Sequence, residues 1–293
     1  MLGHFETTRP AVSVVGHRGA TTHREPARVM PENTIPAFVE AHRQGAAIEL
    51  DVMSTQDGKV VVHHDFKTGR MFRLPSVQKK VRNTTWKELQ YAEFNAKEHE
   101  RSIRRLMGPA TPYKSPQAFE KLQVPALEAV LDRLPEARFY IELKTVAPFG
   151  NGDLEKKVAR IIQERKLEDR VTVLSFSPVS LRKIKRHNPK IHTALNVDIP
   201  PFIKQNALLL KGFVNVYAKG LAKANAIQPS YSDVTPGLVQ TARSAGMPLV
   251  AWASGETREE ERQKFPKLLA MGVNGLITNA VDLLNEVIKK QPD

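Results

Sequence analysis

Two acidic side chains lie one residue apart in a segment that has the composition of a buried strand. The segment, residues 48–65, reads IELDVMSTQDGKVVVHHD and contains Glu49, Asp51 and the adjacent histidines His63 and His64. Side chains at positions i and i+2 of a strand point to the same face, so the two carboxylates share one side of the strand. Burying unpaired carboxylates is costly, and the pattern therefore indicates that a cation faces them.

A second group of charged residues follows two other β-rich runs. Glu142 and Lys144 share one face of the run IELK, and His17 and Arg18 end the first run, in GHRGA. Three carboxylates that face one point favour a hard divalent cation, Mg²⁺ or Ca²⁺, over zinc. The two cationic side chains, Arg18 and Lys144, are suited to grip an anion that the metal also binds.

The histidines supply groups that titrate near neutral pH. We predict that His17 and His64 act as acid and base on opposite sides of the bound anion. Alternation along VVVHH sends His63 to the other face of its strand, and we expect it to take no part. An isolated E-x-D pair is more often a structural salt bridge, so the functional interpretation depends on the joint placement of these residues near strand ends.

The elements that must position these residues are short β-branched runs separated by helical patterns. One helix is predicted over TIPAFVEAHRQG, with Thr34 as its N-cap. Its predicted apolar face consists of Ile35, Phe38, Val39 and His42. Eight βα units predict an α/β fold, a (β/α)₈ TIM barrel, whose active site lies at the C-terminal ends of the strands. The eight predicted strands are AVSVVGH (11–17), AAIELDV (46–52), RFYIELK (138–144), RVTVLSF (170–176), IHTALNV (191–197), ANAIQP (224–229), MPLVAWA (247–253) and GVNGLIT (272–278).

The pattern changes after the second strand. Asp57 and Gly58 predict a tight hairpin turn that returns the histidines toward the mouth of the barrel. Residues 66–124 are irregular and carry thirteen Lys or Arg against five acidic residues, a net charge of +8. We interpret them as an insertion on a single-domain barrel of residues 1–293, and we expect them to overhang the site. A basic rim there would attract anionic substrates or an anionic membrane, whereas the alternative is a solvated surface that aids only solubility.

Composition limits the classes of function. The chain has no cysteine, which excludes disulfides and thiolate metal sites. Its formal net charge of +13 indicates an anionic partner, whether a phosphate ester, nucleic acid or a membrane surface. Neither a membrane-spanning run nor a signal-peptide pattern is present, so we expect a cytoplasmic protein, with a processed exported form as the alternative. The sequence makes no prediction of the oligomeric state.

Eight motifs in the same order resemble the glycerophosphodiester phosphodiesterase family. The resemblance implies a metal-dependent barrel enzyme that hydrolyses small-molecule glycerophosphodiesters to glycerol phosphate and an alcohol. The matching motifs are GHRGA (16–20), PENTIPAF (31–38), IELDVMSTQDGKVVVHHD (48–65), VPALEAVLD (124–132), IELK (141–144), SFSPVSLRKIKRHNP (175–189), MPLVAWAS (247–254) and GVNGLITNAVD (272–282).

The resemblance also implies roles for individual residues. Residues matching Glu49, Asp51 and Glu142 hold the metal in that family. Those matching His17 and His64 form the catalytic pair, and those matching Arg18 and Lys144 contact phosphate. Trp252 matches an aromatic residue that lines the alcohol pocket.

The chain departs from the family at the substrate rim. FKTGRMFRLPS replaces the usual Leu-Asp-Arg-Thr-Thr run after His64-Asp65, the loop TTHREPARVM is longer than usual, and Ala253 replaces a threonine. These changes leave the choice of alcohol open.

Three alternatives to that function remain at this stage. One is lysophospholipase D activity on lysophospholipids, for which the apolar and basic stretch 201–224 would make peripheral membrane contact. The competing interpretation of that stretch is an ordinary barrel helix with a buried face. The second is a non-enzymatic barrel that binds anions or nucleic acid, but no recognition motif supports nucleic-acid binding. The third is an inactive scaffold.

Overall fold

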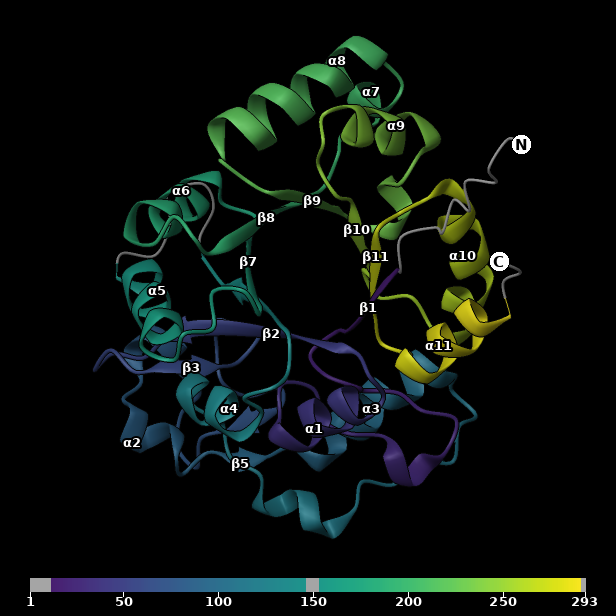
Figure 1. The fold of residues 1–293 in the computed structure, drawn as a ribbon. Coiled ribbons are helices and arrows are strands. Elements are labelled where there is room, and N and C mark those ends of the chain that lie inside the picture. Colours follow the sequence, from purple (N-terminus) through teal and green to yellow (C-terminus); the bar gives the residue numbers. More distant parts are fainter. Residues whose placement is uncertain (1–11, 146–152, 291–293) are drawn as a thin grey trace.

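Eight parallel strands form a nearly closed barrel in the computed structural model, which describes residues 12–145 and 153–290 (Figure 1). The order in the sheet is β10, β11, β1, β2, β6, β7, β8 and β9, and bridges from Ile227 to Leu249 and from Ser230 to Trp252 connect its two edges. All eight predicted strands are confirmed; seven have shorter bounds, and β2 extends two residues beyond its predicted end. These are β1 (Ser13–Gly16), β2 (Ala47–Ser54), β6 (Phe139–Leu143), β7 (Val171–Ser175), β8 (His192–Val197), β9 (Ala226–Pro229), β10 (Val250–Trp252) and β11 (Gly275–Thr278).

Helices surround the barrel and cover its outer face (Figure 1). Apolar side chains of strands and helices pack together in this layer, and a smaller cluster that includes Val15, Leu174 and Ile277 fills the barrel interior. No described helix is long and apolar enough to cross a bilayer. The surrounding helices are α1 (Ile35–Arg43), α4 (Leu127–Arg133), α5 (Leu154–Glu164), α6 (Pro178–His187), α7 (Pro201–Lys204), α8 (Ala207–Gly212), the π-helical η4 (Phe213–Leu221), α9 (Pro236–Ser244), α10 (Arg258–Met271) and α11 (Val281–Lys289), with short 3₁₀ turns η1 (Pro26–Arg28) and η5 (Tyr231–Asp233).

Helix α1 forms where the sequence predicts it, with Thr34 as its N-cap residue, but it differs from the prediction in two details. Its buried face consists of Ala37, Phe38 and Ala41, whereas Val39 is 36% exposed and His42 is also exposed. Small residues are needed on that face because the chain turns closely against it: a Cβ on Gly19 would lie 2.6 Å from the Cβ of Ala37. Thr34 is the N-cap residue, but its hydroxyl donates to the carbonyl of Pro31 at 2.6 Å instead of accepting from the helix.

The predicted hairpin is confirmed, and the insertion packs on it. Strand β3 (Val60–Val62) pairs antiparallel with β2, with Ser54 opposite Val60. An apolar cluster joins Met53 and Val61 of this hairpin to Phe72 and Leu89 of the insertion, which lies along this side of the barrel (Figure 1). That the whole chain folds as one domain stays a prediction. The elements of the insertion are β4 (Phe72–Arg73), η2 (Val81–Asn83), α2 (Trp86–Leu89), β5 (Glu93–Phe94), α3 (Ala96–Met107) and η3 (Gln117–Lys121).

Strand register sets the height of the site residues. Asp51 and Glu142 are direct partners across β2 and β6, so their side chains leave neighbouring strands at the same level. Gly16 is the partner of Ile48 across β1 and β2, which brings His17 level with Glu49. The alternation inferred from the sequence therefore delivers its charged residues to one end of the barrel, the end formed by the C-termini of the strands.

Candidate active site

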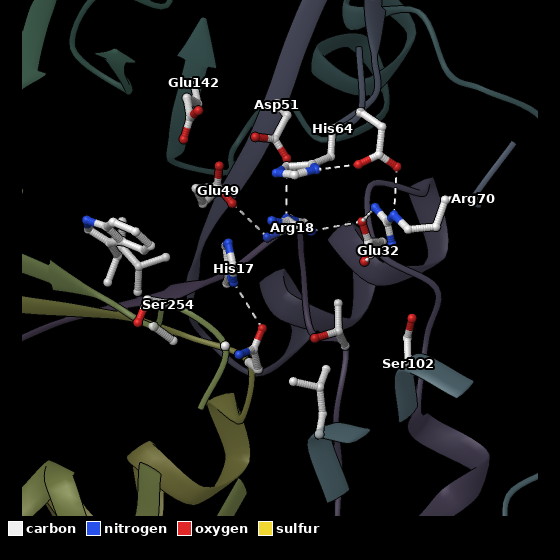
Figure 2. A pocket seen from close by; sticks show the side chains of 18 of the residues that line it. His17, Arg18, Glu32, Glu49, Asp51, His64, Arg70, Ser102, Glu142 and Ser254 are labelled. Carbon is white, nitrogen blue, oxygen red and sulfur yellow. Dashed lines mark hydrogen bonds and ion pairs between the residues drawn. The ribbon is translucent and has the colours of Figure 1, made fainter. Parts of the chain in front are cut away.

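The predicted site residues line one cavity of about 520 Å³ at the mouth of the barrel. Figure 2 shows Glu142, Asp51 and Glu49 on one side of this cavity, with Arg18 beside them and His17 and His64 on either side of Arg18. Trp252 lies in the lining as well. The structure thus brings together all eight predicted site residues, which come from β1, β2, β3, β6, β10 and their following loops: His17, Arg18, Glu49, Asp51, His64, Glu142, Lys144 and Trp252.

Glu49, Asp51 and Glu142 form a compact acidic cluster. Each offers an oxygen, and these oxygens lie within 4.8 Å of one another. Burial, with the charges of Asp51 and Glu142, raises the pKa of Glu49 well above its usual value. Burial and Asp51 also raise the pKa of Glu142, although Lys144 opposes the shift. Carboxylates that resist ionisation because they crowd one another are suited to a divalent cation, and oxygen ligands of this kind fit Mg²⁺ or Ca²⁺.

Asp51 is held as the charged member of the cluster. Burial opposes ionisation, but Lys144, His64 and Arg18 together lower the pKa of Asp51. The amide of Asn33 donates to its carboxylate at 2.8 Å, and the side-chain oxygen of Asn33 accepts from its backbone N–H at 3.2 Å. Asn33 lies in the PENT motif, and these two hydrogen bonds make it a support for the acidic cluster, a role that the sequence pattern does not reveal.

Arg18 and Lys144 are fixed beside the carboxylates by ion pairs. The backbone N–H of Arg18 donates to Glu49 at 2.7 Å, and its guanidinium contacts Glu32 at 3.0 Å and Asp51 at 3.4 Å. The Nζ atom of Lys144 lies 2.8 Å from Glu142 and 3.6 Å from Asp51. Both cationic side chains therefore lie directly against the acidic cluster.

Two residues of this site have strained backbones. Arg18 and Asn33 have φ angles of 55° and 54°, in the left-handed region that non-glycine residues seldom adopt. The N–H of Asn33 donates to the carbonyl of Arg18 at 3.0 Å, so the two strained positions are joined. Strain of about 1–3 kcal/mol at such a position persists where the surroundings enforce it, as happens at functional sites.

His17 is held by the loop that follows β11. Its Nδ1 atom lies 3.0 Å from the side-chain oxygen of Asn279. Asn279 is anchored in turn, because its backbone N–H donates to Glu261 at 3.1 Å. The pKa of His17 is lowered to about 3, mainly by burial and secondly by the charge of Arg18. The imidazole is therefore neutral at neutral pH.

His64 is held by a chain of charges that ends at the same arginine. Its Nδ1 atom lies 2.8 Å from a carboxylate oxygen of Asp65, and the other oxygen of Asp65 accepts from Arg70 at 2.6 Å. Arg70 also binds Glu32 at 3.0 Å, which in turn binds Arg18. Arg70 comes from the insertion, so this segment helps to orient His64 (Figure 2).

His63 lies outside the cavity, as the alternation predicts. It is buried, its Nδ1 atom lies 2.8 Å from the backbone carbonyl of Asp65, and its ring lies 6.5 Å from that of Phe72. His63 therefore supports the turn that carries His64.

The far side of the cavity is formed by aromatic and amide side chains. Trp252 contacts Phe176 edge to face at 5.9 Å and donates from Nε1 to the carbonyl of Gln228 at 3.1 Å. Asn196 donates to Glu142 at 3.1 Å, and the fully buried amide of Gln228 has no protein partner among the described residues. Sequence reasoning missed Asn196, Gln228 and Asn279. The sequence feature that could have identified these three residues is a polar side chain at or just after the C-terminal end of a predicted strand.

Helix α3 of the insertion covers part of the cavity. Arg101, Ser102, Arg105 and other α3 residues line it, which confirms that the insertion overhangs the site. Of the thirteen Lys and Arg residues in the insertion, Arg70, Arg101 and Arg105 line the cavity, and the other ten lie outside its lining. Lys79 pairs with Glu88 at 2.7 Å outside the cavity lining.

The geometry agrees with comparisons to known proteins. Residues 17–283 match the model of the "Glycerophosphoryl diester phosphodiesterase family". The chain is 28% identical to a glycerophosphodiester phosphodiesterase of Caldanaerobacter subterraneus subsp. tengcongensis, over 94% of this chain and 98% of the relative. It is 29% identical to one of Bacillus subtilis, over 95% of this chain and 87% of the relative.

Solved structures share the fold. A protein of Silicibacter pomeroyi superposes with a TM-score of 0.75 at 23% identity, covering 96% of this chain and 94% of that one. An Oleispira antarctica phosphodiesterase, solved in complex with its product sn-glycerol-3-phosphate, superposes with a TM-score of 0.69 at 18% identity, covering 95% of this chain and 97% of that one. The barrel is thus an architecture found in other solved proteins.

Proposed function

This chain belongs to the glycerophosphoryl diester phosphodiesterase family, and on that premise we propose how its site hydrolyses glycerophosphodiesters to glycerol phosphate and an alcohol. The enzyme is a phosphoric diester hydrolase. Glu49, Asp51 and Glu142 hold one divalent cation, Mg²⁺ or Ca²⁺, and the close approach of their three oxygens is the observation that carries this proposal. Such a cation supplies Lewis-acid polarisation of a phosphoryl oxygen when it is bound.

Arg18 and Lys144 bind the phosphate of the substrate. Their ion pairs with the carboxylates hold both cationic groups in place before substrate arrives. Preorganised donors stabilise negative charge that develops in the transition state, because no reorganisation is needed at the moment of reaction. The two residues therefore lower the barrier to attack at phosphorus.

His17 acts as the general base. The side-chain oxygen of Asn279 only accepts hydrogen bonds, so the proton of the neutral imidazole lies on Nδ1, and Nε2 is free to accept a proton. We assign it the proton of the glycerol hydroxyl that attacks phosphorus. The lowered pKa of His17 keeps the ring in its accepting form over the whole neutral range.

His64 acts as the general acid. Its Nδ1–H donates to Asp65, whose carboxylate stabilises a protonated ring. The protonated ring delivers a proton to the departing alkoxide, so that the alcohol leaves neutral. The new bond from the glycerol hydroxyl to phosphorus and the loss of the alkoxide leave a cyclic phosphodiester of glycerol. Water then opens this ring with the two histidines in reversed roles, which completes the hydrolysis. Trp252 and Phe176 line the part of the cavity that receives the alcohol.

A substrate panel tests the proposal. Glycerophosphocholine, glycerophosphoethanolamine, glycerophosphoglycerol and a lysophospholipid are incubated with enzyme that was chelated and then supplied with Mg²⁺ or Ca²⁺. We expect metal-dependent release of glycerol phosphate from the water-soluble diesters. Release of lysophosphatidic acid from the lysophospholipid at a higher kcat/KM would favour lysophospholipase D activity, and no hydrolysis of any diester with either metal would contradict the proposal.

The basic side chains of α3 are expected to make the enzyme favour anionic over zwitterionic substrates. Replacing Arg101 and Arg105 by glutamine removes two positive charges from the cavity lining. We expect kcat/KM for the anionic glycerophosphoglycerol to fall about three- to tenfold at low salt, because exposed charges act mainly by screened steering. The value for zwitterionic glycerophosphocholine should change little. Both constants are measured at low and physiological ionic strength.

A matched control separates the rim from the net charge of the protein. Lys79→Gln with Lys80→Gln removes the same charge from the insertion, outside the cavity lining. This variant should behave as the unaltered enzyme. An equal loss of kcat/KM in both double variants, or an equal loss of kcat/KM on both substrates, would argue against substrate selection by α3.

A further inference from the structure

Large apolar side chains are exposed along the helical segment that follows β8. Among the described residues, ten large hydrophobic side chains are exposed, and half of them lie between residues 202 and 221. Leu208 and Val216 are 76% and 70% exposed. Isolated exposed apolar residues are common, but such a concentration in one segment marks a surface that contacts another apolar phase. The five residues are Phe202, Leu208, Leu209, Val216 and Leu221.

The exposed residues are ordered in rows. Helix α8 continues into the π-helical η4, and side chains four residues apart therefore lie nearly in line. One row is buried against the barrel and consists of Leu210, Val214, Ala218 and Ala222. The row two positions away faces outward and presents Leu208 and Val216, with Gly212 between them and Gly220 after Val216. The segment thus has a second apolar face that the barrel does not cover.

A third row is basic. It consists of Lys211, Asn215, Lys219 and Lys223, all exposed. The chain has no acidic residue between positions 199 and 232, although it has 31 acidic residues in total. An apolar face flanked by lysines and free of carboxylates is complementary to an anionic lipid surface. Two copies of the chain that met through this face would bring their lysine rows together and repel each other.

The segment begins beside the mouth of the active-site cavity. Pro201 and Lys204 of α7 line a small cleft together with Ser254, and Ser254 also lines the main cavity. From there α8 and η4 run along the outside of the barrel, where α8 packs on α9 and η4 on α6 (Figure 1). Contact through this segment would therefore hold the cavity mouth close to whatever surface the segment binds.

We propose that residues 201–223 dock the enzyme on the surface of an anionic lipid bilayer. Phe202, Leu208 and Val216 enter the headgroup region, and the lysine row meets anionic headgroups. Docking of this kind is peripheral, since an amphipathic helix buries one face at the boundary of headgroups and acyl chains without crossing the bilayer. The inference concerns binding and stands independently of the chemistry proposed for the site.

Vesicle flotation tests the apolar face. The protein is mixed with vesicles of phosphatidylcholine alone, or with 30 mol% phosphatidylglycerol, and the bound fraction is measured after flotation. We expect binding to the anionic vesicles, and a fall of about tenfold or more in the partition coefficient for Leu208→Ser with Val216→Ser. The control Val77→Ser with Tyr91→Ser changes two exposed apolar residues elsewhere and should bind normally.

The lysine row is tested in the same assay. Lys211→Gln with Lys223→Gln should weaken binding to anionic vesicles by about fivefold for each lysine at low salt. Lys156→Gln with Lys267→Gln removes two exposed lysines on other helices and should have little effect. Melting temperatures of all variants should match the unaltered protein, since the changed side chains are exposed.

Three results would overturn the proposal. The first is that the unaltered protein does not float with anionic vesicles, and the second is that it binds neutral and anionic vesicles equally. The third is that the variants and their controls lose vesicle binding to the same extent. A fall in molar mass by light scattering for Leu208→Ser with Val216→Ser, with flotation unchanged, would assign the face to self-association instead.

Discussion

Chelation of divalent cations is expected to abolish the activity of this enzyme and to lower its melting temperature, and Mg²⁺ or Ca²⁺ to restore both. The reason lies in the acidic cluster. Burial and mutual repulsion raise the pKa of Glu49 and of Glu142, so the cluster opposes folding as long as its charge is not compensated. A cation that binds only the folded state adds stability by mass action, about 2.7 kcal/mol at a hundred times its Kd. For a chain of this size that corresponds to a shift of about 5 °C.

The ligand set is tested by the same melting experiment. Glu49→Gln removes a ligand and relieves repulsion, so this variant should gain stability without metal and lose most of its response to metal. Glu40→Gln is the control, because Glu40 is also buried but pairs with Arg28 and Arg43 away from the cavity. That variant should keep the full metal response. Full activity after exhaustive chelation would contradict the assignment, as would a metal response that survives Glu49→Gln unchanged.

Much of this site followed from strand geometry alone. The period of two along a strand places Glu49 beside Asp51, and the rule that barrel sites lie at strand C-termini brings Glu142 and His17 to them. The separation of His63 from His64 follows from the same alternation. These predictions succeeded because they depend on local backbone geometry, which a β-branched run specifies strongly.

The features that sequence reasoning missed depend on the paths of loops. Glu32 follows β1 and Arg70 belongs to the insertion, and only the folded loops bring them together around Arg18 and Asp65. The predicted face of α1 was right for Ile35 and Phe38 and wrong for Val39 and His42, for a related reason. Periodicity pointed to Val39 and His42, but the close approach of Gly19 selects the alanine side of the helix.

The second large effect is expected from the histidines. His17→Ala and His64→Ala should each lower kcat by about 10²–10⁴, the usual contribution of general acid or base catalysis. Both variants should still bind the metal, measured by the melting shift, and glycerol phosphate, measured by calorimetry. His63→Ala should instead lower the melting temperature while keeping most of kcat, since His63 is buried and its Nδ1 contacts only the carbonyl of Asp65. Combining the two catalytic changes should cost less than the product of the single losses, because the two groups act as a unit.

A substrate with an activated leaving group assigns the two roles separately. The p-nitrophenyl ester of glycerol phosphate releases a phenolate that needs no proton, so a missing general acid should matter little for it. If His64 is the acid that protonates the alkoxide, His64→Ala should recover most of its rate on this ester, whereas His17→Ala should remain slow because the attacking hydroxyl still requires a base. Asp65→Asn should follow His64→Ala in this respect, since Asp65 supports the protonated ring. Recovery of His17→Ala in place of His64→Ala would reverse the assignment, and a normal rate of both variants on glycerophosphocholine would remove the pair from the mechanism.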